Sequence, residues 1–261
     1  MNNQYKEYLD SYFSTLLDFR HSTNRLNKIL KKDVEIYTKK DATFHSGSAL
    51  IISDWSGPTD NGWELNFHTG IRKETNKENY EIEYKRILSR ECCLMYAQSF
   101  EALEKFIKDC LFNQQLRNNE LNEYIITLLR KEDSLVTREL MPGGEKLFKI
   151  LKKAGGKTFQ KHSKQNNKNI KFKELWTVLS ESRHSITHSS SRIKKNKLNK
   201  SEHHFAIFNS LFNSSDLENE YLLIELDYKK LDKLIKNLSE FAFQILKILS
   251  TEDKIEWKVY E

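Results

Sequence analysis

Glycine and proline are scarce in this chain, whose 261 residues include only 8 Gly and 2 Pro. Folds built from many short strands use both residues at their turns, so the scarcity argues against a turn-rich all-β fold and for long helices. Cysteine is also rare, and the three thiols are Cys92, Cys93 and Cys110. An odd number of cysteines inside a helix-patterned region is not a disulfide framework, which makes a reducing cytosol the expected setting.

Long apolar runs are missing as well. No uninterrupted apolar stretch approaches the ~20 residues that a membrane span needs, and residues 1–7 lack the apolar run of a signal peptide. No Cys/His cluster has the spacing of a zinc site. The composition, 31 % charged and 38 % hydrophobic with a net charge of +6, is that of a soluble protein with a core. We therefore expect a cytoplasmic protein with no cofactor, no metal and no membrane partner.

Apolar residues recur at three- and four-residue spacing in several segments, which is the pattern of amphipathic helices. The segments with this pattern are residues 4–31, 79–115, 121–129, 145–153, 172–188 and 227–250. The segment 79–115 is long enough for one helix or for two joined by a kink. Tyr221–Leu226 reads as a strand that precedes the last helix.

Residues 34–70 have a different character. Ala49–Ser53 and Trp63–Phe67 read as two strands, and the Gly, Pro, Asp and Asn residues between them supply turn chemistry. We expect a β-hairpin or an extended flap attached to a helical body. Four ring side chains of this region either touch a substrate or, as is more usual, pin the flap to the bundle: His45, Trp55, Trp63 and His68.

Two stretches carry basic residues and no acid. Residues 151–173 contain eight lysines, and residues 189–200 contain five basic residues. Such runs are usually solvated loops, but these two bracket a helix with a candidate phosphate-binding arginine, which favours RNA as a partner. The residues that would contact RNA are Lys157, Lys161, Lys164, Arg192, Lys194, Lys195 and Lys197.

The sequence Gly155-Gly156-Lys157-Thr158 is similar to the end of a phosphate-binding loop. The complete pattern requires a glycine five residues before Gly156, and that position is Leu151. No strand precedes it either. We therefore do not expect a phosphate-binding loop here.

The helix expected over residues 172–188 carries the clearest chemistry. Its apolar face includes Phe172 and Ile186, and Arg183 lies on that same face, where an arginine is costly unless it meets an anion or an acid. His184 and His188 are one helical turn apart. An arginine can bind phosphate oxygens, and a histidine can transfer a proton near neutral pH. These two abilities are the minimum for cleaving RNA, which supplies its own 2′-hydroxyl nucleophile.

The pattern Arg183-His184-x-x-x-His188 resembles the signature of the HEPN superfamily, an arginine followed by a polar residue, three further residues and a histidine. Ser99–Ile107 is similar to the aromatic–Ala-Leu-Glu run of the first long HEPN helix. A strand and a long helix follow the motif, as they often do in that family. The resemblance covers roughly Asn79–Ser250. It implies a mainly α fold, with a HEPN-type helical bundle at residues 78–261 and an N-terminal helix plus a small β-hairpin extension at residues 1–77 packed on it.

The resemblance implies a function too. Many HEPN proteins are metal-independent endoribonucleases that act as homodimers with their motif helices face to face, and Arg183, His184 and His188 would then be catalytic. Residues five apart on a helix point ~140° away from each other, which a second motif helix would remedy. The protein would be a toxin or an anti-phage defence effector with an antitoxin or another defence-system partner. In one toxin group a partner nucleotidyltransferase modifies a tyrosine two residues after the motif histidine; Ser190 stands there in this chain.

Two other interpretations remain open. A catalytically silent HEPN module would bind RNA or a partner protein, although it has no need to keep all three polar motif residues. A structural bundle with a chance motif would use Arg183 as the partner of an acid such as Glu101 or Glu104. In that bundle His188 would serve as a cation at the C-terminal end of its helix.

Overall fold

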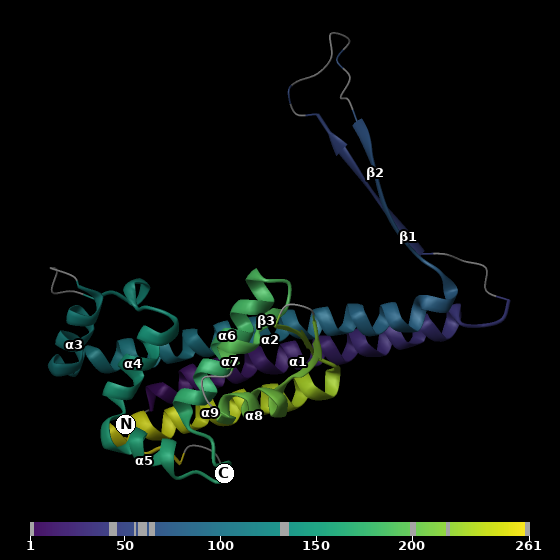
Figure 1. Ribbon diagram of the computed structural model, residues 1–261. Helices are drawn as coiled ribbons and strands as arrows, with labels where there is room; N and C mark the ends of the chain where they lie inside the picture. The colour runs from purple at the N-terminus through teal and green to yellow at the C-terminus, as the bar shows by residue number, and fades with distance from the viewer. Residues whose placement is uncertain are drawn as a thin grey trace. The chain divides into compact units, whose positions relative to one another are not determined.

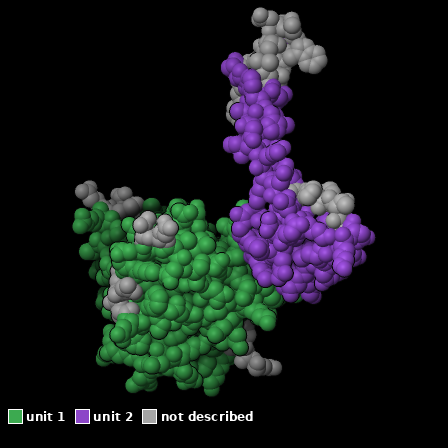
Figure 2. Space-filling model, turned by 45° about the vertical axis from the view of Figure 1, so that its right-hand side comes forward, with its two compact units in different colours: residues 1–24, 89–261 green, residues 25–88 purple. Residues whose placement is uncertain are grey.

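The computed structural model describes residues 3–41, 46–54, 56, 62, 66–130, 136–198, 202–217 and 220–258 (Figure 1). It is mainly α-helical with small sheets, as the sequence predicts. The chain divides into two compact units, residues 1–24 with 89–261 and residues 25–88 (Figure 2). These units do not coincide with the ranges 1–77 and 78–261 suggested by the sequence, because their boundaries fall inside the two longest helices.

Those two helices are α1 (Gln4–Tyr37) and α2 (Tyr80–Gln115). α1 continues beyond the expected end at Lys31, and α2 is one continuous helix. Cys92, Cys93 and Cys110 are all buried in α2 as free thiols, and burial raises the pKa of Cys92 and of Cys93 to about 12. These cysteines therefore act as small apolar core residues.

The larger unit also contains the remaining helices and a three-stranded sheet. Its elements after α2 are α3 (Asn119–Leu129), η2 (Arg138–Leu140), α4 (Gly144–Ala154), α5 (Gly156–Lys164), α6 (Phe172–His188), β3 (Arg192–Lys194), α7 (Lys195–Leu198), α8 (Glu202–Leu211), β4 (Asn213–Asp216), β5 (Tyr221–Glu225) and α9 (Tyr228–Glu252). The sheet is antiparallel in the order β3-β5-β4. The predicted strand is thus confirmed as β5. The first basic segment, expected to be a loop, instead contains α5.

A line of aromatic rings runs through the core of this unit and joins five helices. The rings belong to Phe100 on α2, Trp176 and Phe172 on α6, Phe148 on α4, Phe159 on α5 and Phe241 on α9. Successive ring centroids are between 5.1 and 5.6 Å apart. Tilted and edge-to-face pairs at this spacing are favourable beyond the area that they bury. The rings therefore position α6 from both sides.

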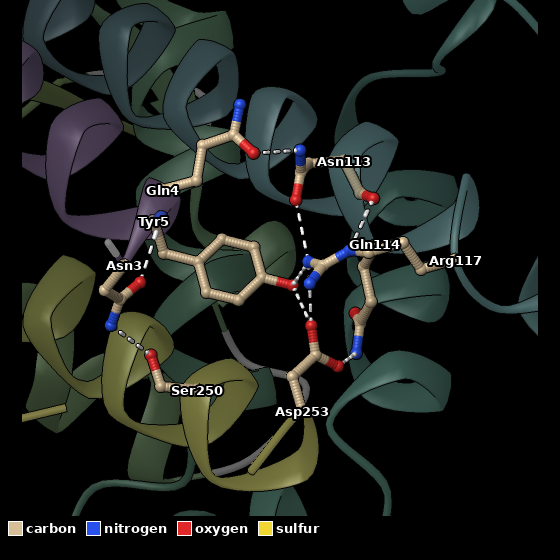
Figure 3. Close-up of polar contacts among 8 residues, drawn as sticks. All are labelled: Asn3, Gln4, Tyr5, Asn113, Gln114, Arg117, Ser250 and Asp253. Atoms are coloured by element: carbon tan, nitrogen blue, oxygen red, sulfur yellow. Dashed lines mark hydrogen bonds and ion pairs between the residues drawn. The ribbon is translucent and has the colours of Figure 1, made fainter. Parts of the chain in front are cut away.

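A polar cluster joins the start of α1 to the ends of α2 and α9 (Figure 3). The hydroxyl of Tyr5 donates to Oδ2 of Asp253 at 2.5 Å, and Arg117 donates to the same oxygen at 2.9 Å. Gln114 donates to Oδ1 of Asp253 at 2.9 Å, and Asn3 donates to Ser250 at 3.0 Å. Most of the polar groups in the cluster bond to one another, although Oε1 of Gln114 is buried without a hydrogen-bond partner among the described residues. We therefore interpret the cluster as a structural clamp.

The smaller unit consists of the second part of α1, a two-stranded hairpin, the short η1 (Lys77–Asn79) and the start of α2. The hairpin pairs β1 (Ser46–Ser53) with β2 (Asn66–Thr75) in antiparallel register, with a bulge between Ala49 and Ile51. The predicted hairpin is confirmed, although β2 runs well beyond the expected Phe67. His45, Trp55 and Trp63 lie outside the described residues. His68 is exposed, and its Nδ1 accepts a hydrogen bond from the amide of Gly70 at 3.0 Å.

No helix in the described part of the chain combines the length and the apolar character that crossing a membrane requires.

Candidate functional site

The candidate site lies at the C-terminal end of α6. The helix buries Phe172, Trp176 and Leu179 against the core, and the hydroxyl of buried Tyr96 on α2 donates to the carbonyl of Leu179 at 2.6 Å. Because the core fixes the body of α6, its last two turns present their polar residues in a defined orientation.

The end of α6 is tied down as well. The amides of Ser189 and Ser191 both donate to the carbonyl of Ser185 at 3.0 Å, and Ser191 accepts a hydrogen bond from Ile224 on β5 at 2.8 Å. Ser190 and Ser191 have φ angles of 51° and 64°, the left-handed conformation in which helices commonly end. The turn after His188 is therefore held against the three-stranded sheet.

Arg183 is partly exposed and forms an ion pair. Its Nη2 lies 2.8 Å from Oε1 of Glu101 on α2, and the two side chains are 28 % and 51 % exposed. Its Nε is buried and has no hydrogen-bond partner in the described part of the chain. Glu104, the other acid expected to pair with Arg183, instead accepts a hydrogen bond from the amide of Gly144 at the start of α4 (2.7 Å). The ion pair lies at the edge of the helix interface and is open to solvent.

The two histidines lie next to each other on the exposed face of α6. The ring centroids of His184 and His188 are 4.8 Å apart, with a 46° angle between the planes. Counted from Arg183 at 100° per residue, they project at about 100° and about 140° around the helix. Within the described ranges neither ring forms a hydrogen bond. Two adjacent accessible imidazoles can contact a bound anion and exchange protons with it.

The second basic segment lies beside this end of α6, because β3 contacts α6. Of its four described basic residues, two are compensated by acids from elsewhere in the chain. Lys195 pairs with Asp216 at 2.6 Å and Lys197 with Glu181 at 2.8 Å. The ammonium of Lys194 lies 5.6 Å from the centroid of the Tyr221 ring. Arg192 is exposed and forms no ion pair with any described residue.

The lysines of α5 are near the other end of α6. Phe159 on α5 packs on Phe172, the first residue of α6, with ring centroids 5.5 Å apart. Eleven residues of helix separate Phe172 from Arg183, which is about 16 Å at 1.5 Å per residue. Lys157, Lys161 and Lys164 form no ion pair with the described residues. The two basic segments thus flank opposite ends of α6 and do not form one patch around the motif.

The glycine pair before α5 is not a phosphate site. The amide of Thr158 donates to Oε1 of Glu252 at 3.3 Å, and a Cβ placed on Gly156 would lie 3.3 Å from the other oxygen of that carboxylate. A side chain of the same protein therefore occupies the place at the N-terminus of α5 that a bound phosphate would take.

In the described ranges, no three His, Cys, Asp or Glu side chains come together in a group that could hold a metal ion. Comparison with known proteins finds no matching family model, no matching curated protein and no matching solved structure. The assignment of function therefore depends on the chemistry of the site.

Proposed function

We propose that this protein is a metal-independent endoribonuclease of HEPN type that cleaves RNA by attack of the 2′-hydroxyl. The observation that supports the proposal is the exposed face at the end of α6. On it the imidazoles of His184 and His188 are 4.8 Å apart. Arg183, one and five positions before them in the same helix and so about 100° and 140° away around it, is 28 % exposed. The residue types and their accessibility suit acid–base chemistry on a phosphodiester.

In the proposed reaction, neutral His188 removes the proton of the 2′-hydroxyl. The 2′-oxygen then attacks phosphorus, the bond from phosphorus to the 5′-oxygen breaks, and a protonated imidazole gives its proton to that leaving oxygen. The products are a 2′,3′-cyclic phosphate and a 5′-hydroxyl. His184, one turn from His188, orients it or assists in the proton transfer. Arg183 stabilises the extra negative charge on the phosphorane, an effect typically worth ~3–4 kcal/mol.

Arg183 has donors to spare for this role. Nη2 is used by Glu101, whereas Nη1 forms no hydrogen bond within the described residues. A guanidinium can bind a phosphate through one nitrogen while an acid holds another. Glu101 thereby acts as a positioning residue that fixes the arginine at the edge of the site.

We propose further that the active form is a homodimer in which two motif faces meet, because the arginine and the histidines of one helix diverge. Mixing Arg183→Ala with His188→Ala protein tests this arrangement. If each site combines an arginine from one subunit with a histidine from the other, the mixture regains a fraction of wild-type cleavage. A mixture as inactive as its two components, from subunits shown to exchange, argues against the shared site.

The biological role that the resemblance suggests is a toxin or an anti-phage effector acting on RNA, held in check by an antitoxin or another defence-system partner. Co-expression of the active protein with the products of neighbouring genes, scored by cell growth, tests this role. Growth restored by one neighbour, and not by unrelated proteins, identifies the partner.

Cleavage itself is tested on labelled single-stranded RNA in the presence of EDTA. Wild-type protein should leave 2′,3′-cyclic phosphate ends, and Arg183→Ala and His188→Ala should each lose 10²–10⁴-fold in rate. His184→Ala should be milder. His203→Ala is the matched control, because His203 is an exposed histidine on α8 outside the motif. Equal loss in the control would show that the effect is not specific to the site.

The second candidate is a catalytically silent module that binds RNA or a partner protein. The ion pair between Arg183 and Glu101 favours it, because the pair gives the arginine a role that needs no substrate. Wild-type protein that binds RNA and leaves it intact under all of these conditions would establish that alternative.

A further inference from the structure

A second feature of the larger unit lies near the start of α6, away from the motif. It is a pocket of about 460 Å³ between α5, the loop that follows α5, and α9. This volume falls within the range of small-molecule sites, roughly 300–1,000 Å³. We call it the α5–α9 pocket. It shares no residue with the motif Arg183–His188, and one of its lining residues, Lys161, is also a predicted RNA contact.

The floor of the α5–α9 pocket is apolar. It is formed by Phe172, Leu175 and Phe241, among others, all of them core residues with at most 9 % of their surface exposed. The rings of Phe172 and Phe241 meet edge to face, with centroids 5.2 Å apart and planes at 74°. Two rings at this angle form an apolar corner at the bottom of the pocket, which suits the apolar part of a ligand.

The rim carries a net positive charge. Lys161, Lys168 and Lys247 line the pocket together with one acid, Glu240, and Lys168 already pairs with Glu240. Lys161 and Lys247 have no acidic partner in the described part of the chain. The ammonium of Lys247 is 4.1 Å from the centroid of the Trp257 ring, a cation–π contact that holds it in place. Two uncompensated ammonium groups above an apolar floor favour an anion and disfavour a cation.

Hydrogen bonds within the loop hold the wall that it forms. The side chain of Asn166 donates to the carbonyls of His162 and Ile170, at 3.1 and 2.8 Å, and accepts from the amides of Lys168 and Ile170 at 3.2 Å. Lys168 also donates to Asn237 on α9 at 2.6 Å. One asparagine thus closes the loop on itself, and one lysine ties it to α9. A preformed wall reduces the entropic cost of binding.

From the corner of rings, the two uncompensated lysines and the preformed loop, we infer that the α5–α9 pocket binds a small aromatic carboxylate. Its ring system would lie on Phe172 and Phe241, and its carboxylate would lie between Lys161 and Lys247. His162 lines the same rim and can donate a hydrogen bond to the ligand. A carboxylate between two ammonium groups forms charge-assisted hydrogen bonds, the stronger class.

Three probes that share one ring system and differ in charge test the inference on the full chain. They are naphthalene-2-carboxylate, naphthalene-2-methanol and naphthalene-2-methylammonium, titrated by calorimetry. The carboxylate should bind, the alcohol should bind roughly tenfold more weakly, and the ammonium should be weaker still. Equal affinity for all three, or no binding of the carboxylate, overturns the inference.

Paired variants test whether the probe binds in the α5–α9 pocket. Lys161→Gln/Lys247→Gln should weaken binding of the carboxylate about tenfold or more and leave the alcohol unchanged. The control pair is Lys164→Gln/Lys236→Gln, which removes two exposed lysines from the same two helices outside the pocket and should leave both probes unchanged. Gln244→Trp, on the rim, should block both probes.

Equal weakening in the two lysine pairs would mean general charge attraction and would overturn the site. Displacement of the bound carboxylate by RNA would also overturn the inference, because the pocket would then be part of an RNA-binding surface.

Discussion

The carboxylate of Glu101 on α2 accepts a hydrogen bond from the guanidinium of Arg183 on α6, with 2.8 Å between Oε1 and Nη2. The contact links the two segments on which the family resemblance depends, the Ser99–Ile107 run and the motif. Both side chains remain partly exposed, at 51 % and 28 %, and ion pairs open to solvent typically contribute ~0–1 kcal/mol to stability. A phosphate can therefore compete for this arginine at little cost to the fold.

Arg183→Ala should consequently lower the free energy of unfolding by less than about 1 kcal/mol. Arg117→Ala is the comparison, because Arg117 contacts Tyr5, Asn113 and Asp253 in the polar clamp. It should cost more, about 1–2 kcal/mol. Urea unfolding of both variants measures the two effects. A cost for Arg183→Ala above that for Arg117→Ala would make the motif arginine a structural residue.

The two glutamates of α2 should respond differently to neutralisation. Glu101→Gln removes a negative charge that repels a phosphate bound at the other nitrogen of Arg183, and it keeps an oxygen that can still hold the guanidinium, so affinity for single-stranded RNA should rise a few-fold. Glu104→Gln replaces the carboxylate that accepts a hydrogen bond from the amide of Gly144, at the start of α4, with a neutral amide. This change should lower the free energy of unfolding by ~0.5–1 kcal/mol and leave RNA affinity unchanged. Fluorescence anisotropy measures the RNA affinity of both variants, and urea unfolding measures their stability. If Glu101→Gln leaves RNA affinity unchanged, the phosphate does not bind at Arg183.

Periodic apolar patterns made much of the fold predictable. The long helices follow from apolar spacing, and the hairpin and β5 follow from short strand-like runs and the turn residues of the hairpin. The sequence also identified Glu101 as one of two acids able to meet Arg183. The α5–α9 pocket and the clamp around Asp253 could not be predicted. Tyr5 and Asp253 are 248 positions apart, and no local pattern records such a pairing. The ion pairs of the second basic segment could not be predicted for a related reason, because the acids that compensate Lys195 and Lys197 come from other elements.

The basic residues nearest the motif should carry most of the salt dependence of RNA binding. Arg192→Ala/Lys194→Ala should make the slope of log K against log salt shallower by up to about 1.4, since each lost contact with single-stranded RNA changes it by ~0.7. The triple variant Lys157→Ala/Lys161→Ala/Lys164→Ala should have a smaller effect on a short RNA, because α5 lies near the far end of α6. Equal slopes for wild type and both variants would mean that these segments are solvated surface.

The polar clamp should be a main contributor to the stability of the larger unit. Asp253→Ala removes the acceptor shared by Tyr5, Gln114 and Arg117 and leaves the hydroxyl of Tyr5 and the amide of Gln114 without that acceptor, so we expect a loss of about 2 kcal/mol or more. Tyr5→Phe removes one donor and keeps the ring, and should cost less, roughly 0.5–1.5 kcal/mol. Thermal melts of both variants measure the difference. If Asp253→Ala melts at the same temperature as the wild type, the clamp does not contribute to stability.

His162 should make stability depend on pH. Burial lowers the pKa of its imidazole. A hydrogen bond with Gln244 raises this pKa in part, and the positive charges of Lys247 and Lys161 lower it further. Lys168 and Glu240, a mutual ion pair, also line the rim.

Because the folded pKa of His162 lies below the unfolded value of ~6.5, the unfolded chain binds the proton more readily. The stability contributed by neutral His162 is therefore complete above about pH 7 and decreases as pH falls below ~6.5. In His162→Gln, urea midpoints should fall less between about pH 7 and about pH 5 than in wild type. His203→Gln, at an exposed histidine, is the control. If the wild type and His162→Gln profiles coincide over this interval, the imidazole is not held in its neutral form.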